Sequence, residues 1–115
     1  MKFKNKEVYK VVEVLNHAVV NKVAIYDLTS ITPYFDFSII CTANSSRQAH
    51  AAVNYLKDFA EENGIIVKGY TKDEGALWQL VDMNNIIVHV FVGDERNKYH
   101  LDDLYYELPK HIIED

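Results

Sequence analysis

Apolar residues recur at helical spacing near the start of the chain. This spacing would gather them on one side of a helix, and it predicts an amphipathic helix over residues 6–20. Its apolar positions are Val8, Val11, Val12, Leu15, Ala18 and Val19. An apolar run at 23–28 then predicts a strand, and the segment 29–34, which contains Pro33, predicts a turn.

After the turn the pattern changes to alternation with a period of two. Phe35, Phe37, Ile39 and Cys41 stand at every second position and predict a second strand over 35–42. Ser45, followed three residues later by Gln48, is a capping-box pattern that predicts the start of a second helix. Gly64 predicts its end. The expected buried stripe comprises Ala49, Ala52, Val53, Leu56, Phe59 and Ala60.

Three short apolar runs in the second half predict three more strands, at 65–70, 77–82 and 86–92. Asn84-Asn85 separates the last two and predicts a two-residue hairpin turn, because Asn tolerates positive φ. A final helix is expected from about Asn97 to Pro109, and it carries Leu101, Leu104, Tyr105 and Leu108 on one face.

The predicted elements follow the order α-β-β-α-β-β-β-α. The two hairpin-like connections exclude an all-parallel sheet, because parallel neighbours need longer crossovers. We therefore expect an α/β (α+β) fold in which helices pack on a mixed five-stranded sheet. The whole chain, residues 1–115, is expected to form one domain.

The predicted hairpin also fixes which side chains share a face. A two-residue turn sets Trp78 opposite Phe91, Leu80 opposite His89, and Asp82 opposite Ile87. Two interpretations of this face are open. It is either a core layer under a helix, with His89 and Asp82 satisfied locally, or a recognition surface with an aromatic anchor.

Composition narrows the class of protein. Hydrophobic residues make up 49% of the 115 residues and charged residues 25%, which is typical of a globular domain. No stretch approaches the ~20 apolar residues that span a bilayer, and no signal-peptide core follows the basic N-terminus. A cytosolic location without membrane contact is therefore expected.

The net charge of −5 argues against a dedicated nucleic-acid binder. The charge is uneven, since residues 1–24 hold five lysines against two acids, whereas residues 93–115 hold three basic residues against seven acids. The acidic end would suit a basic protein partner, although solvated helix surfaces explain the same distribution.

The sequence contains no pattern typical of a catalytic or metal site. The five histidines, at positions 17, 50, 89, 100 and 111, are scattered over separate elements without metal-ligand spacing. The single cysteine, Cys41, is expected to be a small buried residue. Ser45-Ser46 lacks a neighbouring base or a Gly-rich phosphate loop, and Asp36, Asp73 and Glu74 do not form the close D-x-D pair that two-metal phosphoryl transfer requires. We expect no catalytic residue, no metal and no cofactor.

Several motifs occur together in a specific order. Phe35-Asp36-Phe37-Ser38-Ile39-Ile40-Cys41-Thr42-Ala43-Asn44-Ser45 comes first, Glu74-Gly75-x-x-Trp78-x-Leu80-x-Asp82 follows, then His89-Val90-Phe91, and Arg96-x-x-Tyr99-x-Leu101-x-x-Leu104-Tyr105 closes the set. In this ordered set the chain resembles the ribosomal silencing factor family, also called the Iojap or YbeB family, over roughly residues 8–108. Three positions depart from the family pattern: Ala43 replaces a glycine, Ser38 an aromatic residue and Tyr105 a tryptophan.

The resemblance implies a nucleotidyltransferase-like fold, a homodimer and a cytoplasmic translational repressor rather than an enzyme. Such a repressor binds the large ribosomal subunit on its fourteenth ribosomal protein and blocks joining of the small subunit when nutrients are short. The matching partner-binding residues are Trp78, Leu80, Asp82, His89, Arg96 and Tyr99, which favours the recognition interpretation.

Two alternatives to this function remain open at the level of sequence. The first is a nucleotidyltransferase-like enzyme that still binds nucleotides, although the chain lacks the Gly-Ser and paired-aspartate motifs that such chemistry uses. The second is a dimeric adaptor for another basic protein. A pull-down from lysate would distinguish the two binding functions. Mainly ribosomal proteins would indicate the repressor, and mainly other proteins would indicate the adaptor.

Overall fold

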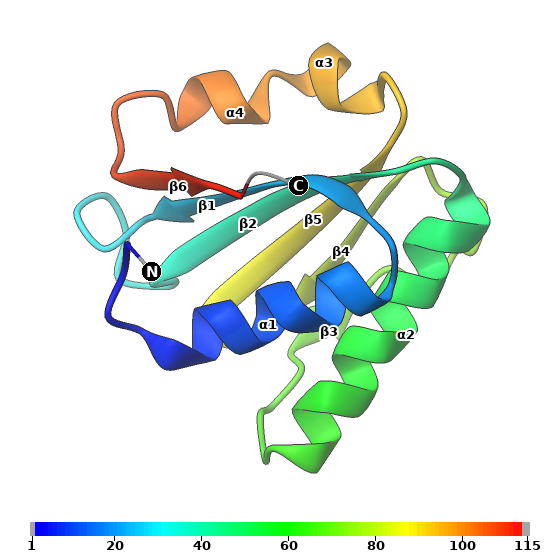
Figure 1. Ribbon diagram of the computed structural model, residues 1–115, viewed down its shortest axis with the longest axis horizontal. Helices are drawn as coiled ribbons and strands as arrows, with labels where there is room; N and C mark the ends of the chain where they lie inside the picture. Colours follow the sequence, from blue (N-terminus) through cyan, green and yellow to red (C-terminus); the bar gives the residue numbers. More distant parts are fainter. Residues whose placement is uncertain (1, 114–115) are drawn as a thin grey trace.

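The computed structural model describes residues 2–113 and confirms the mixed α/β class (Figure 1). The elements in chain order are α1 (Lys6–His17), β1 (Asn21–Asp27), β2 (Phe37–Ala43), α2 (Ser46–Glu62), β3 (Gly69–Tyr70), β4 (Trp78–Asp82), β5 (Ile86–Val92), α3 (Glu95–Tyr99), α4 (Leu101–Leu104) and β6 (Lys110–Ile112).

The strands form one open sheet in the order β3-β4-β5-β2-β1-β6. The central pair, β2 and β5, is parallel, and the other neighbouring strands are antiparallel. The sheet is therefore mixed, as expected, but it has six strands instead of five. The additional strand, β6, pairs with β1 just after Pro109. Three residues are too few to show a strand period, so the sequence pattern did not indicate it.

Helices cover both faces of the sheet. Figure 1 shows α1 and α2 on one face and the short helices α3 and α4 on the other. The face under α1 and α2 holds the larger core, which includes Leu15, Ile39, Leu56 and Val88. The opposite face holds a smaller buried cluster of Ala24, Tyr26, Leu28, Ile40 and Phe91. The sheet thus separates two apolar clusters of unequal size.

The two long helices begin where the sequence predicts. The Asn5 side chain accepts a hydrogen bond from the amide of Val8 at 3.0 Å, and Ser45 Oγ accepts one from the amide of Gln48 at 3.1 Å. Both bonds satisfy amides that the first helical turn leaves unpaired. Helix α1 ends at His17 instead of residue 20. The left-handed backbone of Val19, with φ of 64°, prevents its continuation.

Two strand boundaries differ from the sequence prediction because a strand ends where its partner ends. Strand β2 begins at Phe37 instead of residue 35, because its partner β1 ends at Asp27, directly opposite. The predicted strand 65–70 contracts to Gly69–Tyr70, because β4 ends at Asp82, opposite Gly69. Ile66 consequently lies in a loop and is exposed.

The predicted final helix is divided into two short helices, α3 and α4. His100 adopts a left-handed conformation with φ of 55° and separates them. The two segments then make separate contacts: Tyr99 of α3 packs against Trp78, and Tyr105, directly after α4, packs against Tyr26. The sequence pattern did not indicate this break, because Leu101, Leu104, Tyr105 and Leu108 fit a single continuous helical stripe.

Candidate functional site

The predicted hairpin between β4 and β5 is present with the expected register. Asn84 has a φ of 76°, and the amide of Met83 donates to the carbonyl of Ile86 at 2.9 Å. Trp78 pairs with Phe91, Leu80 with His89, and Asp82 with Ile87. These side chains lie on the face of the sheet that carries α3 and α4.

Trp78 is half-buried at the centre of an aromatic group. Its ring centroid lies 4.9 Å from that of Phe91 and 4.6 Å from that of Tyr99, which reaches it from α3. Aromatic contacts at such distances hold the ring in a fixed orientation. One side of the indole is therefore packed against the protein, while part of the ring stays accessible.

His89 holds the indole of Trp78 in place through a hydrogen bond. The indole Nε1 donates a hydrogen bond to Nδ1 of His89 at 3.1 Å. Burial lowers the pKa of the imidazole to about 4, so the ring is neutral at pH 7. Since Nδ1 accepts, the proton of the neutral ring is assigned to Nε2. His89 is 7% exposed, which leaves little of it for an external partner.

Leu80 and Asp82 continue the same face along β4, and both are partly exposed. Asp82 Oδ1 accepts a hydrogen bond from the amide of Asn84 at 3.0 Å and so fixes the hairpin turn. The amide of Leu80 donates to Thr71 Oγ1 at 2.9 Å, which joins β4 to the chain after β3. The face combines a fixed aromatic ring, an aliphatic side chain and a carboxylate, all accessible in part.

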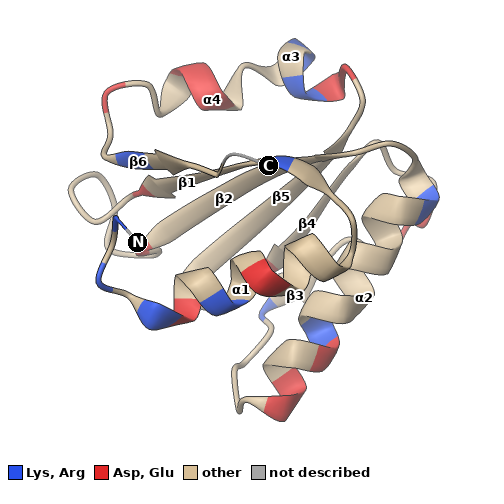
Figure 2. Ribbon diagram, viewed as in Figure 1, with Lys and Arg blue, Asp and Glu red and all other residues tan. Residues whose placement is uncertain are grey.

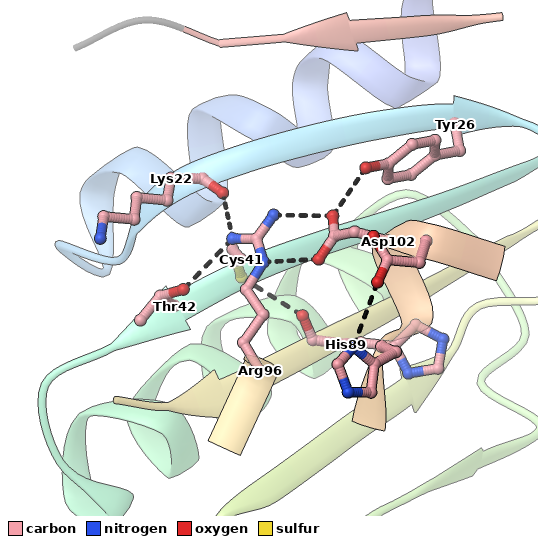
Figure 3. Close-up of polar contacts among 9 residues, drawn as sticks. Lys22, Tyr26, Cys41, Thr42, His89, Arg96 and Asp102 are labelled. Atoms are coloured by element: carbon pink, nitrogen blue, oxygen red, sulfur yellow. Dashed lines mark hydrogen bonds and ion pairs between the residues drawn. The ribbon is translucent and has the colours of Figure 1, made fainter. Parts of the chain in front are cut away.

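Arg96 lies apart from this group, in a polar network that joins α3 and α4 to the sheet (Figure 3). Its Nε and Nη2 atoms donate to the two carboxylate oxygens of Asp102 at 2.9 and 3.0 Å. Its Nη1 atom donates to the carbonyl of Lys22 and to Thr42 Oγ1. A bidentate guanidinium–carboxylate pair has a defined geometry, so this contact fixes α3 relative to α4.

Tyr26 completes the network. Its hydroxyl donates to Oδ1 of Asp102 at 2.6 Å. Burial opposes ionisation of the Asp102 carboxyl, but the hydrogen bonds from Arg96 and Tyr26 and the charge of Arg96 outweigh it and lower its pKa. For Tyr26, burial and the hydrogen bond to Asp102 both raise the pKa of the hydroxyl. At neutral pH the network therefore contains a carboxylate, a guanidinium and a neutral phenol.

A second polar network, on the opposite face, was not indicated by the sequence analysis. Gln79 is fully buried, and its Nε2 atom donates to the carbonyls of Ala76 and Ser46 at 3.0 and 3.1 Å. Its Oε1 atom lies 2.8 Å from Nδ1 of His50. These contacts anchor the loop before Trp78 to α2. The sequence did contain a signal for this network. Gln79 lies between Trp78 and Leu80, and because side chains alternate along a strand, its side chain had to face the opposite side, where the core lies.

The groups considered for catalysis have other roles. The Cys41 thiol is fully buried, and burial raises its pKa to about 12, so it is not a thiolate near neutral pH. Ser45 caps α2. Across residues 2–113, no three His, Cys, Asp or Glu side chains are grouped as a metal site would require. In the same range, no helix has the length and apolar character needed to cross a membrane.

The departures from the family pattern lie within the fold. Ser38 is fully buried, and its hydroxyl has no hydrogen-bond partner among the described residues. Ala43 ends β2 and accepts a hydrogen bond from the amide of Gly93 at 3.0 Å, so the following turn still presents Ser45 as a cap. Tyr105 packs on Tyr26, with ring centroids 5.4 Å apart.

Comparison with known proteins assigns the family. The model of the family described as "Ribosomal silencing factor during starvation" matches residues 2–115. The Ribosomal silencing factor RsfS of Bacillus subtilis is 41% identical over 83 residues, which cover 72% of this chain and 70% of that protein. This chain therefore belongs to the ribosomal silencing factor family.

Solved structures agree with this assignment. A crystal structure of a protein from Bacillus halodurans superposes with a TM-score of 0.80 at 33% identity, covering 95% of this chain and all of that one. A protein from Chromobacterium violaceum superposes with a TM-score of 0.82 at 24% identity, covering 98% and 95% of the two chains, and supports the fold alone.

Proposed function

We propose that this protein is a translational repressor that binds the large ribosomal subunit and sterically prevents the small subunit from joining. Membership of the ribosomal silencing factor family supports a role at the ribosome. The fourteenth protein of the large subunit is the proposed partner, as the family resemblance implies. Repression by exclusion needs a tightly bound surface and no chemical step.

The observation that carries the proposal is the accessible face of β4. Trp78 is held rigidly by Phe91, Tyr99 and His89, which lowers the entropy lost when it is buried by a partner. Large aromatic residues of this kind dominate the energy of many interfaces. Leu80 would add apolar contact, and Asp82 would offer a carboxylate to a basic group.

The six proposed interface residues have different roles in this proposal. Trp78, Leu80, Asp82 and the exposed Tyr99 touch the partner. His89 orients Trp78, and Arg96 holds α3 so that Tyr99 stays in place. This division follows from the contacts of each side chain, because four of the five N–H groups of Arg96 already have partners within the chain.

Charge favours a protein partner over ribosomal RNA. The chain carries a net charge of −5 at pH 7. Figure 2 shows acidic residues on α4 and at the end of α2, while basic residues gather at the start of α1. Phosphates would repel the acidic surface, whereas a basic ribosomal protein would attract it.

Sedimentation of ribosomal subunits tests the proposal directly. Purified subunits and this protein are run on a sucrose gradient at a magnesium concentration that favours joined ribosomes. We expect the protein to migrate with the large subunit and the amount of joined ribosomes to fall. Absence of co-migration at near-physiological salt would contradict the proposal, and unchanged joining despite binding would contradict exclusion as the mechanism.

We also propose that the free protein is a cytoplasmic homodimer. The family resemblance supports this state. Sedimentation equilibrium should then give about twice the 13.3 kDa mass of the chain. A mass equal to one chain across the concentration range would contradict it, without affecting the ribosome test.

A further inference from the structure

Three large apolar side chains surround one hollow beside α4. Leu104 is 73% exposed, Tyr106 is 71% exposed, and Ile31, in the loop between β1 and β2, is 58% exposed. The hollow has a volume of about 380 Å³, and Asp103, Glu107 and Leu108 complete its lining. We call Ile31, Leu104 and Tyr106 the α4 patch. Grouped apolar residues at a surface are typical of interaction sites.

Leu104 is exposed, although helical spacing would group it with the apolar residues that pack on the sheet. Only Leu101, Tyr105 and Leu108 of this segment pack against the cluster under α4. Leu104 therefore contributes little to that packing, and stability does not account for an apolar residue there.

The charged groups around the α4 patch are two carboxylates and one ammonium group, since Lys110 Nζ lies 4.6 Å from the ring centroid of Tyr106. The local charge is therefore net negative. Asp103 and Glu107 line the hollow, and both are exposed. Figure 2 marks α4 as an acidic element. A second copy of this chain would bring further negative charge overall, since its net charge is −5. A basic protein surface complements both the apolar side chains and the carboxylates, so it is the favoured occupant.

We propose that the α4 patch is a second contact for the basic ribosomal protein that binds Trp78. This inference rests on the proposed function and extends its binding surface from β4 to α4. The two areas lie on the same side of the sheet, because Tyr99 of α3 packs on Trp78 and α4 follows directly after it (Figure 1). One partner surface can then cover the face on both sides of α3.

Binding to purified large ribosomal subunits tests this inference with matched variants. L104Q replaces the apolar group of the patch, and I66Q makes the same kind of change at a 70% exposed residue outside it. Both side chains are exposed, so both variants should fold, which circular dichroism would verify. We expect L104Q to weaken binding about tenfold and I66Q to bind like the unchanged protein.

The results separate this inference from the proposed function. If W78A loses affinity while L104Q binds normally, the repressor function stands and the α4 patch is not a contact. If the unchanged protein does not bind the large subunit, both proposals fail. If L104Q converts a dimer into a monomer and binds the subunit normally, the occupant is a second copy and the basic partner is overturned.

Discussion

At the scale of single residues, the contact between Trp78 and His89 joins the surface of the sheet to its interior. The indole donates to Nδ1 of the imidazole, and burial keeps that ring neutral at pH 7. A protonated ring would carry a hydrogen on both nitrogens and could not accept this bond. The orientation of the tryptophan therefore depends on the protonation state of a buried neighbour.

The lowered pKa of His89 predicts a loss of stability in mild acid. The unfolded chain binds a proton at His89 near pH 6.5, whereas the folded protein binds it near pH 4. The contribution of neutral His89 to the free energy of unfolding is complete above pH 6.5. It is lost as the pH falls towards 4, by up to about 3 kcal/mol. Urea unfolding at pH 7.5 and pH 5 would measure it, with Trp78, the only tryptophan, as the fluorescent probe.

His89→Gln provides the control for this pH dependence. The variant lacks the titrating group, so its stability should fall less than that of the unchanged protein between pH 7.5 and 5. An equal fall in both proteins would assign the acid sensitivity to other groups.

The role of Trp78 in recognition makes a separate prediction. Trp78→Ala removes the central aromatic contact and should reduce the affinity for the large subunit by about 2 kcal/mol or more. Circular dichroism must first show that the variant is folded, because the indole also packs on Phe91. Unchanged affinity of a folded variant would remove Trp78 from the interface.

At the scale of elements, one ion pair positions two short helices. Helices α3 and α4 contain five and four residues, so their own hydrogen bonds cannot keep them folded in isolation. Arg96 of α3 and Asp102 of α4 form the bidentate pair, and the hydroxyl of Tyr26 on β1 donates a hydrogen bond to Asp102. The cover over this face of the sheet is therefore held by a few specific contacts as well as by the apolar cluster beneath it.

Asp102→Asn should loosen this cover. The change keeps the size of the side chain but removes the charge that balances Arg96, which is largely shielded from solvent. We expect a loss of about 1–3 kcal/mol in urea unfolding. Hydrogen exchange should show its largest increase at the amides of α3 and α4.

Tyr26→Phe is the matched comparison for that variant. It removes one hydrogen bond to Asp102 and leaves the ion pair intact. The free energy of unfolding should therefore fall by less, about 1 kcal/mol. A cost equal to that of Asp102→Asn would show that the charge pair is not what stabilises the cover.

Sequence patterns predicted the long elements and the hairpin register, and they failed where tertiary contacts decide local structure. The register of Trp78 with Phe91 followed from a two-residue turn, which is a local feature. The break at His100 did not, because the apolar spacing on both sides of it fits one uninterrupted helix. Strand β6 was also missed, since its pairing with β1 joins distant parts of the chain.

The interface proposal depended in the same way on information beyond local pattern. Alternation placed Trp78, Leu80 and Asp82 on one face, and the structure confirms this arrangement. Neither periodicity nor charge could decide whether that face was core or surface. Its accessibility depends on how far α3 extends over β4, which is a property of the folded protein.

At the scale of the whole molecule, the uneven charge predicts how binding responds to salt. An acidic surface that meets a basic protein associates faster at low ionic strength, and screening slows this approach. We expect the association rate with large subunits, measured by stopped flow, to fall as salt rises from about 50 to 300 mM, while the dissociation rate changes less. An association rate that rises with salt would indicate repulsion and contradict a basic docking surface.

The sheet divides the apolar interior into two clusters, and this division bears on how the protein can evolve. The larger cluster lies under α1 and α2, on the side away from Trp78, and provides most of the buried apolar residues. Substitutions of exposed residues on the Trp78 side thus alter recognition at limited risk to folding. A lineage can in this way adjust its fit to a changing partner while the opposite layer preserves the fold.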